Sequence, residues 1–323
     1  MRNFILIITI VIQISALNIN AHAIDSDMSK YELNYKKYID SKEPLSILRL
    51  RENNCVRESE KYFLSNQINP TYTLYYGSHD LQQLVIYTHK GAKPQLKPVI
   101  FFIHGMFGDR MNVRPAVSSW LSLGYTVVSV NHRFVPAYPF NEQLADCFMA
   151  LKWVIDNIQK YGGDPNNIGL TGLSAGGHMA ALLVTGTKWH KKYNVDITKV
   201  KCWFPMSGFY DLNLSENYLI PMMAEYIKLI CIPSKHDASP VAQITGNEPP
   251  SLIIHGSDDF TIPKTNAIAL HNKLRAKGAK SELAILKNYM HANVFYSYYK
   301  SDHVPAKTIK RFLATYLPTA ENH

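Results

Sequence analysis

The chain has 323 residues, of which 46% are hydrophobic, which is enough for a sizeable buried core. Its formal net charge is +9, but the basic residues are scattered apart from one short run at 190–192. Charge dispersed in this way argues against a nucleic-acid partner and is typical of a property that serves solubility. A preference for acidic substrates stays open.

The first 23 residues have the pattern of an export signal. A short basic start, Met1–Asn3, precedes the apolar run Phe4–Leu17, and Ala21–Ala23 gives the small-x-small cleavage pattern. A membrane anchor is the alternative, but the run contains Gln13 and is shorter than the roughly 20 apolar residues of a membrane span. We therefore expect a signal peptide at 1–23, a domain at 24–323, no stable membrane span, and export to the periplasm or the medium.

Four cysteines lie beyond the predicted signal: Cys55, Cys147, Cys202 and Cys231. Export would permit disulfides, and four cysteines allow three pairings. Cys147 falls in a predicted helix and Cys202 in a predicted strand, so both are also candidates for small core residues. Their spacing contains no C-x-x-C and no metal-ligand pattern, so we expect no metal and no cofactor.

Apolar strands and amphipathic helices alternate along the remaining chain. Strands are predicted at 81–87, 98–103, 125–130, 168–171, 200–206, 251–254 and 281–286. A helix is expected over 142–160, ended by Gly162 and Gly163, another runs to Leu183, and a third is closed by Gly278. This alternation predicts a single α/β domain, with a mostly parallel central sheet and helices on both faces. Functional side chains should follow the carboxyl ends of the strands.

The segment Gly172-Leu173-Ser174-Ala175-Gly176 follows a predicted strand and precedes a predicted helix. It has the form G-x-S-x-G, in which small residues allow a sharp turn that exposes the serine hydroxyl. The alternative, an ordinary helix cap at Ser174, is disfavoured by the strand before it. Ser174 is therefore the candidate nucleophile.

A glycine-containing loop, His104–Asp109, follows the predicted strand that ends at Ile103. Two backbone N–H groups aimed at one point can stabilise the negative oxygen of a tetrahedral intermediate. We assign these donors to Met106 and Ala175. The alternative is that Gly105 and Gly108 only make a turn.

A serine nucleophile requires a histidine base and an acidic group that orients it. Asp259 follows the strand at 251–254, with Asp258 as a competing turn or cap residue. His291 lies after the strand at 281–286 and before the last helical segment, with His303 as a weaker rival. The order Ser174, Asp259, His291 is that of α/β-hydrolases.

These motifs resemble the esterase/lipase group of the α/β-hydrolase superfamily, which includes acetyl esterases, feruloyl-esterase-like enzymes and kynurenine formamidase relatives. The similarity runs through most of the predicted domain, at Tyr76–Ser78, Gln82–Tyr87, Val130–Phe134, Tyr161–Ile168, Gly172–His178, Ser207–Leu212, Ala238–Pro240 and His255–Pro263. It implies the α/β-hydrolase fold and a triad of Ser174, Asp259 and His291. Met106 stands where the group usually has a glycine, and His132 where it usually has a tyrosine.

The expected activity is hydrolysis of a small-molecule or lipid-like ester through an acyl-enzyme intermediate. The segment 212–246, rich in Tyr and Met, is expected to form a small lid over the strand ends, with Tyr218 among its lining residues. Candidate substrate-binding residues are His104, Tyr210, Met222 and Met223. An amidase, formamidase or peptidase on the same triad is one alternative, and a non-catalytic binding protein of the same fold is another. The sequence does not determine the oligomeric state.

Overall fold

The computed structural model describes residues 45–66, 68–88, 95–106, 108–135, 137–217, 221–230 and 234–321. The predicted signal peptide, Tyr218 and Cys231 lie outside these residues. Within the described helices, the side chains of residues 45–53, 63–64, 215–217 and 221–225 are also outside the description.

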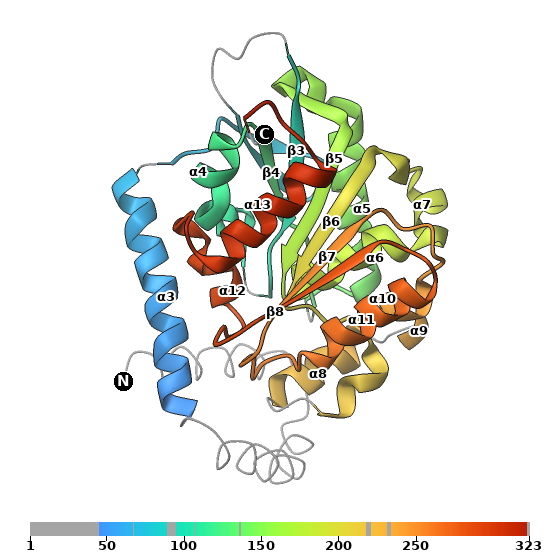
Figure 1. Ribbon diagram of the computed structural model, residues 1–323. Coiled ribbons are helices and arrows are strands. Elements are labelled where there is room, and N and C mark those ends of the chain that lie inside the picture. The colour runs from blue at the N-terminus through green and yellow to red at the C-terminus, as the bar shows by residue number, and fades with distance from the viewer. Residues whose placement is uncertain are drawn as a thin grey trace.

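An eight-stranded sheet forms the centre of the molecule (Figure 1). The strands are β1 (Tyr72–Tyr75), β2 (Gln83–Tyr87), β3 (Lys97–Ile103), β4 (Thr126–Val130), β5 (Gly163–Leu173), β6 (Val200–Met206), β7 (Ser251–Gly256) and β8 (Ser281–Leu286). Their order in the sheet is β1-β2-β4-β3-β5-β6-β7-β8. β2 is antiparallel to β1 and β4, and the strands from β4 to β8 are parallel. The predicted mostly parallel sheet is confirmed.

Helices cover both faces of the sheet (Figure 1). One face carries α4 (Arg114–Ser122), α12 (Asn293–Tyr296) and α13 (Val304–Tyr316), and α3 (Leu45–Asn66) packs outside them. The other face carries α5 (Phe140–Asn157), α6 (Ala175–Thr185), α7 (Thr187–Tyr193), α10 (Pro240–Gln243) and α11 (Thr265–Ala276). Two further helices, α8 (Pro221–Ile230) and α9 (Lys235–Ala238), belong to the predicted lid segment between β6 and β7.

Each face has its own hydrophobic cluster, because parallel strands bury side chains on both sides. Phe101 and Ile103 of β3 point into the cluster under α5 and α6, while Ile100 and Phe102 point into the cluster under α4 and α13. Cys147 and Cys202 are fully buried free thiols, one in each cluster, as expected for small core residues.

The central strands end together at one edge of the sheet. Ile103 of β3 pairs with Gly172 of β5, and Leu173 pairs with Met206 of β6. Gly256 at the end of β7 pairs with Leu286 at the end of β8. The loops that follow β3, β5, β7 and β8 therefore share one edge, which is where the sequence predicts the functional residues.

Candidate active site

Ser174 occupies the turn between β5 and α6 in a conformation that residues with side chains rarely adopt. Its backbone angles are φ 59° and ψ −119°, and its N–H donates a 2.9 Å hydrogen bond to the carbonyl of Met206. Such strain costs on the order of 1–3 kcal/mol and persists only where the surroundings impose it.

The glycines on either side of Ser174 are required by close backbone contacts. A Cβ at Gly172 would lie 2.4 Å from the Gly176 carbonyl oxygen, and a Cβ at Gly176 would lie 2.0 Å from the Ile103 carbonyl oxygen. No side chain fits at either distance, so the sharp turn depends on both glycines. The close contact between Gly176 and the Ile103 carbonyl places the start of α6 against the end of β3.

The loop after β3 lies directly against the nucleophile. A Cβ at Gly105 would lie 3.4 Å from the Ser174 Cβ and 3.1 Å from the Leu173 carbonyl oxygen. The Gly105 carbonyl accepts hydrogen bonds from the His104 Nδ1 (2.7 Å) and from the Gly108 N–H (3.1 Å), which fix the turn. Met106 follows Gly105 in this turn and is half-buried against the core. Ala175, the other predicted donor, is the first residue of α6.

The ring of His104, in the loop after β3, stacks on the ring of a second histidine, His132. The rings of His104 and His132 stack with centroids 4.3 Å apart and an interplanar angle of 9°, and both residues are buried. Burial lowers the pKa of both imidazoles, and the neighbouring His132 lowers that of His104 further. Both rings are therefore neutral near pH 7, where two stacked imidazolium ions would repel each other. The stack gives His132 a packing role next to the loop that follows β3.

The segment after His132 is anchored by a buried ion pair. The Asp146 carboxylate, on α5, accepts hydrogen bonds from the Arg133 N–H (2.9 Å), Nε (2.9 Å) and Nη2 (2.8 Å) and from the Gln82 Nε2 (2.6 Å). Arg133 Nη1 also pairs with Glu142. Burial acts to raise the pKa of Asp146, but the hydrogen bonds from Arg133 outweigh it and lower the pKa. This network fixes the chain that carries the His104–His132 stack.

The structure pairs His291 with Asp259. Nδ1 of His291, in the loop after β8, lies 2.8 Å from Asp259 Oδ2. Asp259 Oδ1 accepts two backbone hydrogen bonds, each 2.9 Å, from Thr261 and Ile262. Burial acts to raise the pKa of Asp259, but attraction to His291 and His255 outweighs it and holds the pKa below its usual range. The carboxylate is therefore ionised at neutral pH and can orient the imidazole.

The competing residues have other contacts. Asp258 accepts a 2.8 Å hydrogen bond from the Ser257 hydroxyl, and its N–H donates to the Tyr289 carbonyl, as expected of a turn residue. His303 is the residue before α13, with its ring 6.3 Å from that of Tyr299.

A residue that the sequence analysis did not single out, His255, also contacts Asp259. Its Nε2 lies 3.0 Å from Asp259 Oδ2 and 2.9 Å from the Ile262 carbonyl oxygen, and its side chain is fully buried. In the sequence, His255 lies four residues before Asp259 and directly follows the strand predicted at 251–254.

Of the four predicted substrate-binding residues, the structure describes the side chains of two, His104 and Tyr210. His104 and Tyr210 are buried, and the Tyr210 hydroxyl accepts a 3.0 Å hydrogen bond from the Gly208 N–H. Contact with a substrate would require these two side chains to move. Met222 and Met223 lie in α8, and their side chains are outside the described part of the chain.

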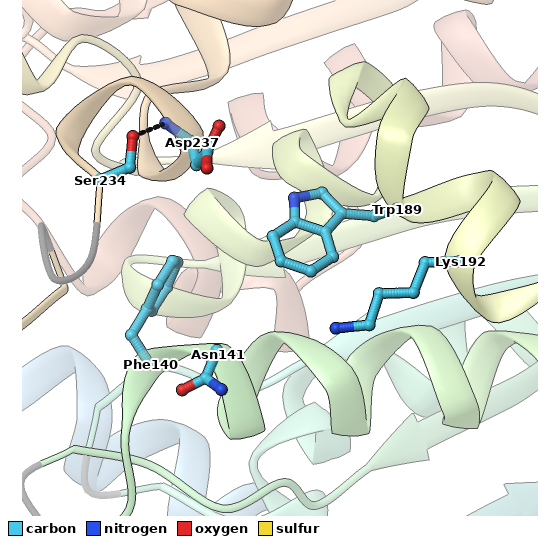
Figure 2. Close-up of a pocket in the computed structure, with 6 residues that line it drawn as sticks. All are labelled: Phe140, Asn141, Trp189, Lys192, Ser234 and Asp237. Atoms are coloured by element: carbon cyan, nitrogen blue, oxygen red, sulfur yellow. Dashed lines mark hydrogen bonds between the residues drawn. The ribbon is translucent and has the colours of Figure 1, made fainter.

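A surface pocket of about 280 Å³ lies away from these residues (Figure 2). Its described lining consists of Phe140, Asn141, Trp189, Lys192, Ser234 and Asp237 and contains no predicted catalytic residue. The amines of Lys188 and Lys192 lie 4.7 and 5.0 Å from the Trp189 ring centroid. Lys188 also pairs with Asp237, which ties α7 to α9. The contacts around this pocket thus join two helices.

The described residues contain no group of three or more His, Cys, Asp or Glu side chains arranged to hold a metal ion. Nor does any helix in the described ranges have the length and apolar character needed to cross a membrane.

The parallel sheet, the strained serine after β5, and the paired aspartate and histidine after β7 and β8 together define an α/β-hydrolase. Residues 84–274 match the family described as BD-FAE, and the chain belongs to this family. Its fold is also that of a carbohydrate esterase from gut microbiota solved in truncated form. That structure has a TM-score of 0.62 and 23% identity over 77% of this chain and 98% of the other. Esterase 2 of Thermogutta terrifontis in its apo form gives a TM-score of 0.62 at 21% identity, over 77% of this chain and 96% of that esterase.

Curated relatives carry esterase names. The probable carboxylic ester hydrolase LipM of Mycobacterium tuberculosis is 32% identical over 193 residues, which are 55% of this chain and 45% of LipM. The isoprenylcysteine alpha-carbonyl methylesterase ICME of Arabidopsis thaliana is 28% identical over 258 residues, 72% of this chain and 58% of that protein. The chain spans about half the length of the curated relatives it matches.

Proposed function

We propose that this protein is a serine hydrolase that cleaves a carboxylic ester through an acyl-enzyme, with Ser174, His291 and Asp259 as its triad. The observation that carries the proposal is the 2.8 Å contact between His291 Nδ1 and Asp259 Oδ2, at the same sheet edge as the strained Ser174. Family membership and the esterase names of the relatives support it.

The mechanism follows from which nitrogen of His291 is engaged. Because Nδ1 faces the Asp259 carboxylate, Nδ1 carries the proton, and Nε2 is the nitrogen left to act as a base. Ser174 Oγ attacks the ester carbonyl while its proton passes to Nε2, and the tetrahedral oxyanion accepts hydrogen bonds from the Met106 and Ala175 N–H groups. Nε2 then gives the proton to the leaving alcohol. Water, activated in the same way, frees the acid and restores Ser174.

The ionised Asp259 supplies the electrostatic part of this mechanism. Its low pKa keeps it negative throughout the cycle, so it stabilises the imidazolium that forms when His291 accepts the proton. Met106 is half-buried at a position of the proposed oxyanion turn where the resemblance leads to a glycine, and we propose that its side chain narrows the acyl side of the site. We therefore expect a preference for small acyl groups.

Labelling with a fluorophosphonate probe tests the nucleophile. The wild-type protein should be labelled, and Ser174→Ala should not be, while its melting temperature stays at or above that of the wild type. Absence of labelling in a folded wild-type protein would favour the alternative of a non-catalytic binding protein.

Substrate series test the bond that is cleaved. Nitrophenyl esters of increasing acyl length should be hydrolysed fastest at short lengths, and matched nitroanilides more slowly than the esters. Faster cleavage of the anilides would assign the triad to an amidase, formamidase or peptidase instead.

Export is a further part of the proposal, and the signal-peptide pattern at 1–23 supports it. N-terminal sequencing of the secreted protein should give a sequence that begins near Ile24.

A further inference from the structure

The carboxylate of Asp259 has two histidine partners on one oxygen. Oδ2 lies 2.8 Å from His291 Nδ1 and 3.0 Å from His255 Nε2. Oδ1 is occupied by the backbone N–H groups of Thr261 and Ile262. The side chains of Asp259 and His255 are both fully buried. Only His291 is needed for the triad as proposed, so the role of His255 requires its own explanation.

The contacts of His255 determine which of its nitrogens carries hydrogen. Nε2 faces the Asp259 carboxylate and the Ile262 carbonyl oxygen, at 3.0 and 2.9 Å, and both can only accept. Nε2 must therefore be the donor. Nδ1 is buried and has no hydrogen-bond partner among the described residues. The Ile262 N–H in turn donates to Asp259 Oδ1, so the three residues close a ring of hydrogen bonds.

We propose that His255 is a positioning residue that holds Asp259 Oδ2 in the direction of the catalytic base. The proposal rests on the proposed function, because it assumes that His291 is that base. The N–H groups of Thr261 and Ile262 fix the position of Asp259 Oδ1. The carboxylate can still rotate about Oδ1, and the donors on Oδ2 set this rotation. His255 comes from the penultimate position of β7 and is rigidly packed, whereas His291 lies in a loop and its side chain is 12% exposed.

This difference in rigidity explains why a second donor is useful. His291 must adjust its position between taking the serine proton and giving it to the leaving alcohol. With His291 as the sole donor on Oδ2, the carboxylate would follow each adjustment. His255 keeps the oxygen in place, so the imidazole returns to a fixed acceptor.

The titratable groups near this carboxylate, among the described residues, are His291, His255 and the Tyr210 phenol. Tyr210 is buried with its hydroxyl bound to the Gly208 N–H, and burial raises the pKa of this phenol, so it stays neutral over the range in which esterases are assayed. A change in the pH profile on substitution of His255 would therefore report the coupling between Asp259 and His291.

The test compares two variants of similar size. His255→Leu fills the space without a donor, and His255→Gln places an amide N–H₂ near the position of Nε2. His190→Leu is the control, because His190 is a partly buried histidine on α7 whose Nε2 lies 2.6 Å from the Leu183 carbonyl oxygen, remote from any carboxylate of the site. Melting temperatures and kcat and KM on a short-chain nitrophenyl ester are measured for all three, together with the pH dependence of kcat/KM.

We expect His255→Leu to lower kcat by roughly ten- to a hundredfold with KM changed little, and His255→Gln to recover most of the loss. The acid limb of kcat/KM in His255→Leu should move to lower pH, because a misplaced carboxylate stabilises the His291 imidazolium less. His190→Leu should have a lower melting temperature and keep the wild-type kcat and pH profile.

Several results would overturn the proposal. They are a folded His255→Leu variant with wild-type kcat, equal losses in the Leu and Gln variants, and an acid limb that stays in place. Failure of the proposed function itself is distinguishable, since the wild-type protein would then neither hydrolyse the ester nor react with the fluorophosphonate. In that case the Nδ1 proton resonance of His291 gives the readout, and it should move upfield in His255→Leu but not in His190→Leu.

Discussion

Gly176→Ala is expected to separate the nucleophile from the oxyanion turn. The added Cβ would lie 2.0 Å from the Ile103 carbonyl oxygen and 2.5 Å from that of His104, and both obstacles are backbone atoms. Contacts of this kind are essentially never shorter than 3.0 Å, so the start of α6 must move away from the end of β3 by about 1 Å. A misplacement of about 1 Å costs on the order of a hundredfold in rate, so we expect kcat on a nitrophenyl ester to fall about a hundredfold.

Gly163→Ala provides the matched control at the opposite end of β5. Its Cβ would also be too close to its neighbours, at 2.5 Å from Ile158 Cγ1 and 2.8 Å from Val99 Cγ2, but these are side-chain atoms far from the nucleophile. This variant should lose stability in urea unfolding and keep the wild-type kcat per folded molecule. If Gly176→Ala hydrolyses the ester within threefold of the wild-type rate, the contact between α6 and β3 does not set the geometry of the site.

Two other substitutions test the electrostatic contacts. Asp146→Ala leaves the Arg133 guanidinium without its buried partner, and we expect a loss of about 3–5 kcal/mol in the free energy of unfolding. Asp156→Ala, which breaks the exposed pair with Lys152, should cost under about 0.5 kcal/mol, and similar losses in both would contradict this reasoning. Because the folded pKa of Asp146 is depressed, its contribution is present above the unfolded pKa of about 3.9, and the difference between wild type and Asp146→Ala should shrink as the pH falls below that value. Asp259→Asn should lower kcat by about 10⁴-fold, with no rescue at high pH, and a loss under tenfold would remove Asp259 from the triad.

The buried strands were predictable because their apolar runs are nearly continuous. β6 and β8 have the predicted bounds, and β3 and β4 differ from prediction by one residue at their starts. β1 was missed because most of its side chains are exposed at the sheet edge, which leaves no alternating pattern to detect. The predicted helix over 142–160 begins earlier, at Phe140, and ends at Asn157, because the next four residues tighten into a 3₁₀ turn.

The sequence predicted site residues where a motif is local and missed them where contact is made by the fold. Ser174 and its glycines follow from a five-residue pattern, and Asp259 and His291 follow from their places after strands. The stack of His104 on His132 joins residues 28 positions apart, in the segments that follow the neighbouring strands β3 and β4, and could not be predicted from either segment alone. His255 was overlooked because its partner, the Asp259 carboxylate, turns back toward β7 only in the folded loop.

The backbone of Ser174 bears on the stability of the protein. At φ 59° and ψ −119° a glycine has less backbone strain than a serine, so Ser174→Gly should raise the free energy of unfolding. Under the proposed function, the strained backbone at Ser174 is therefore a loss of stability that the position of the nucleophile requires.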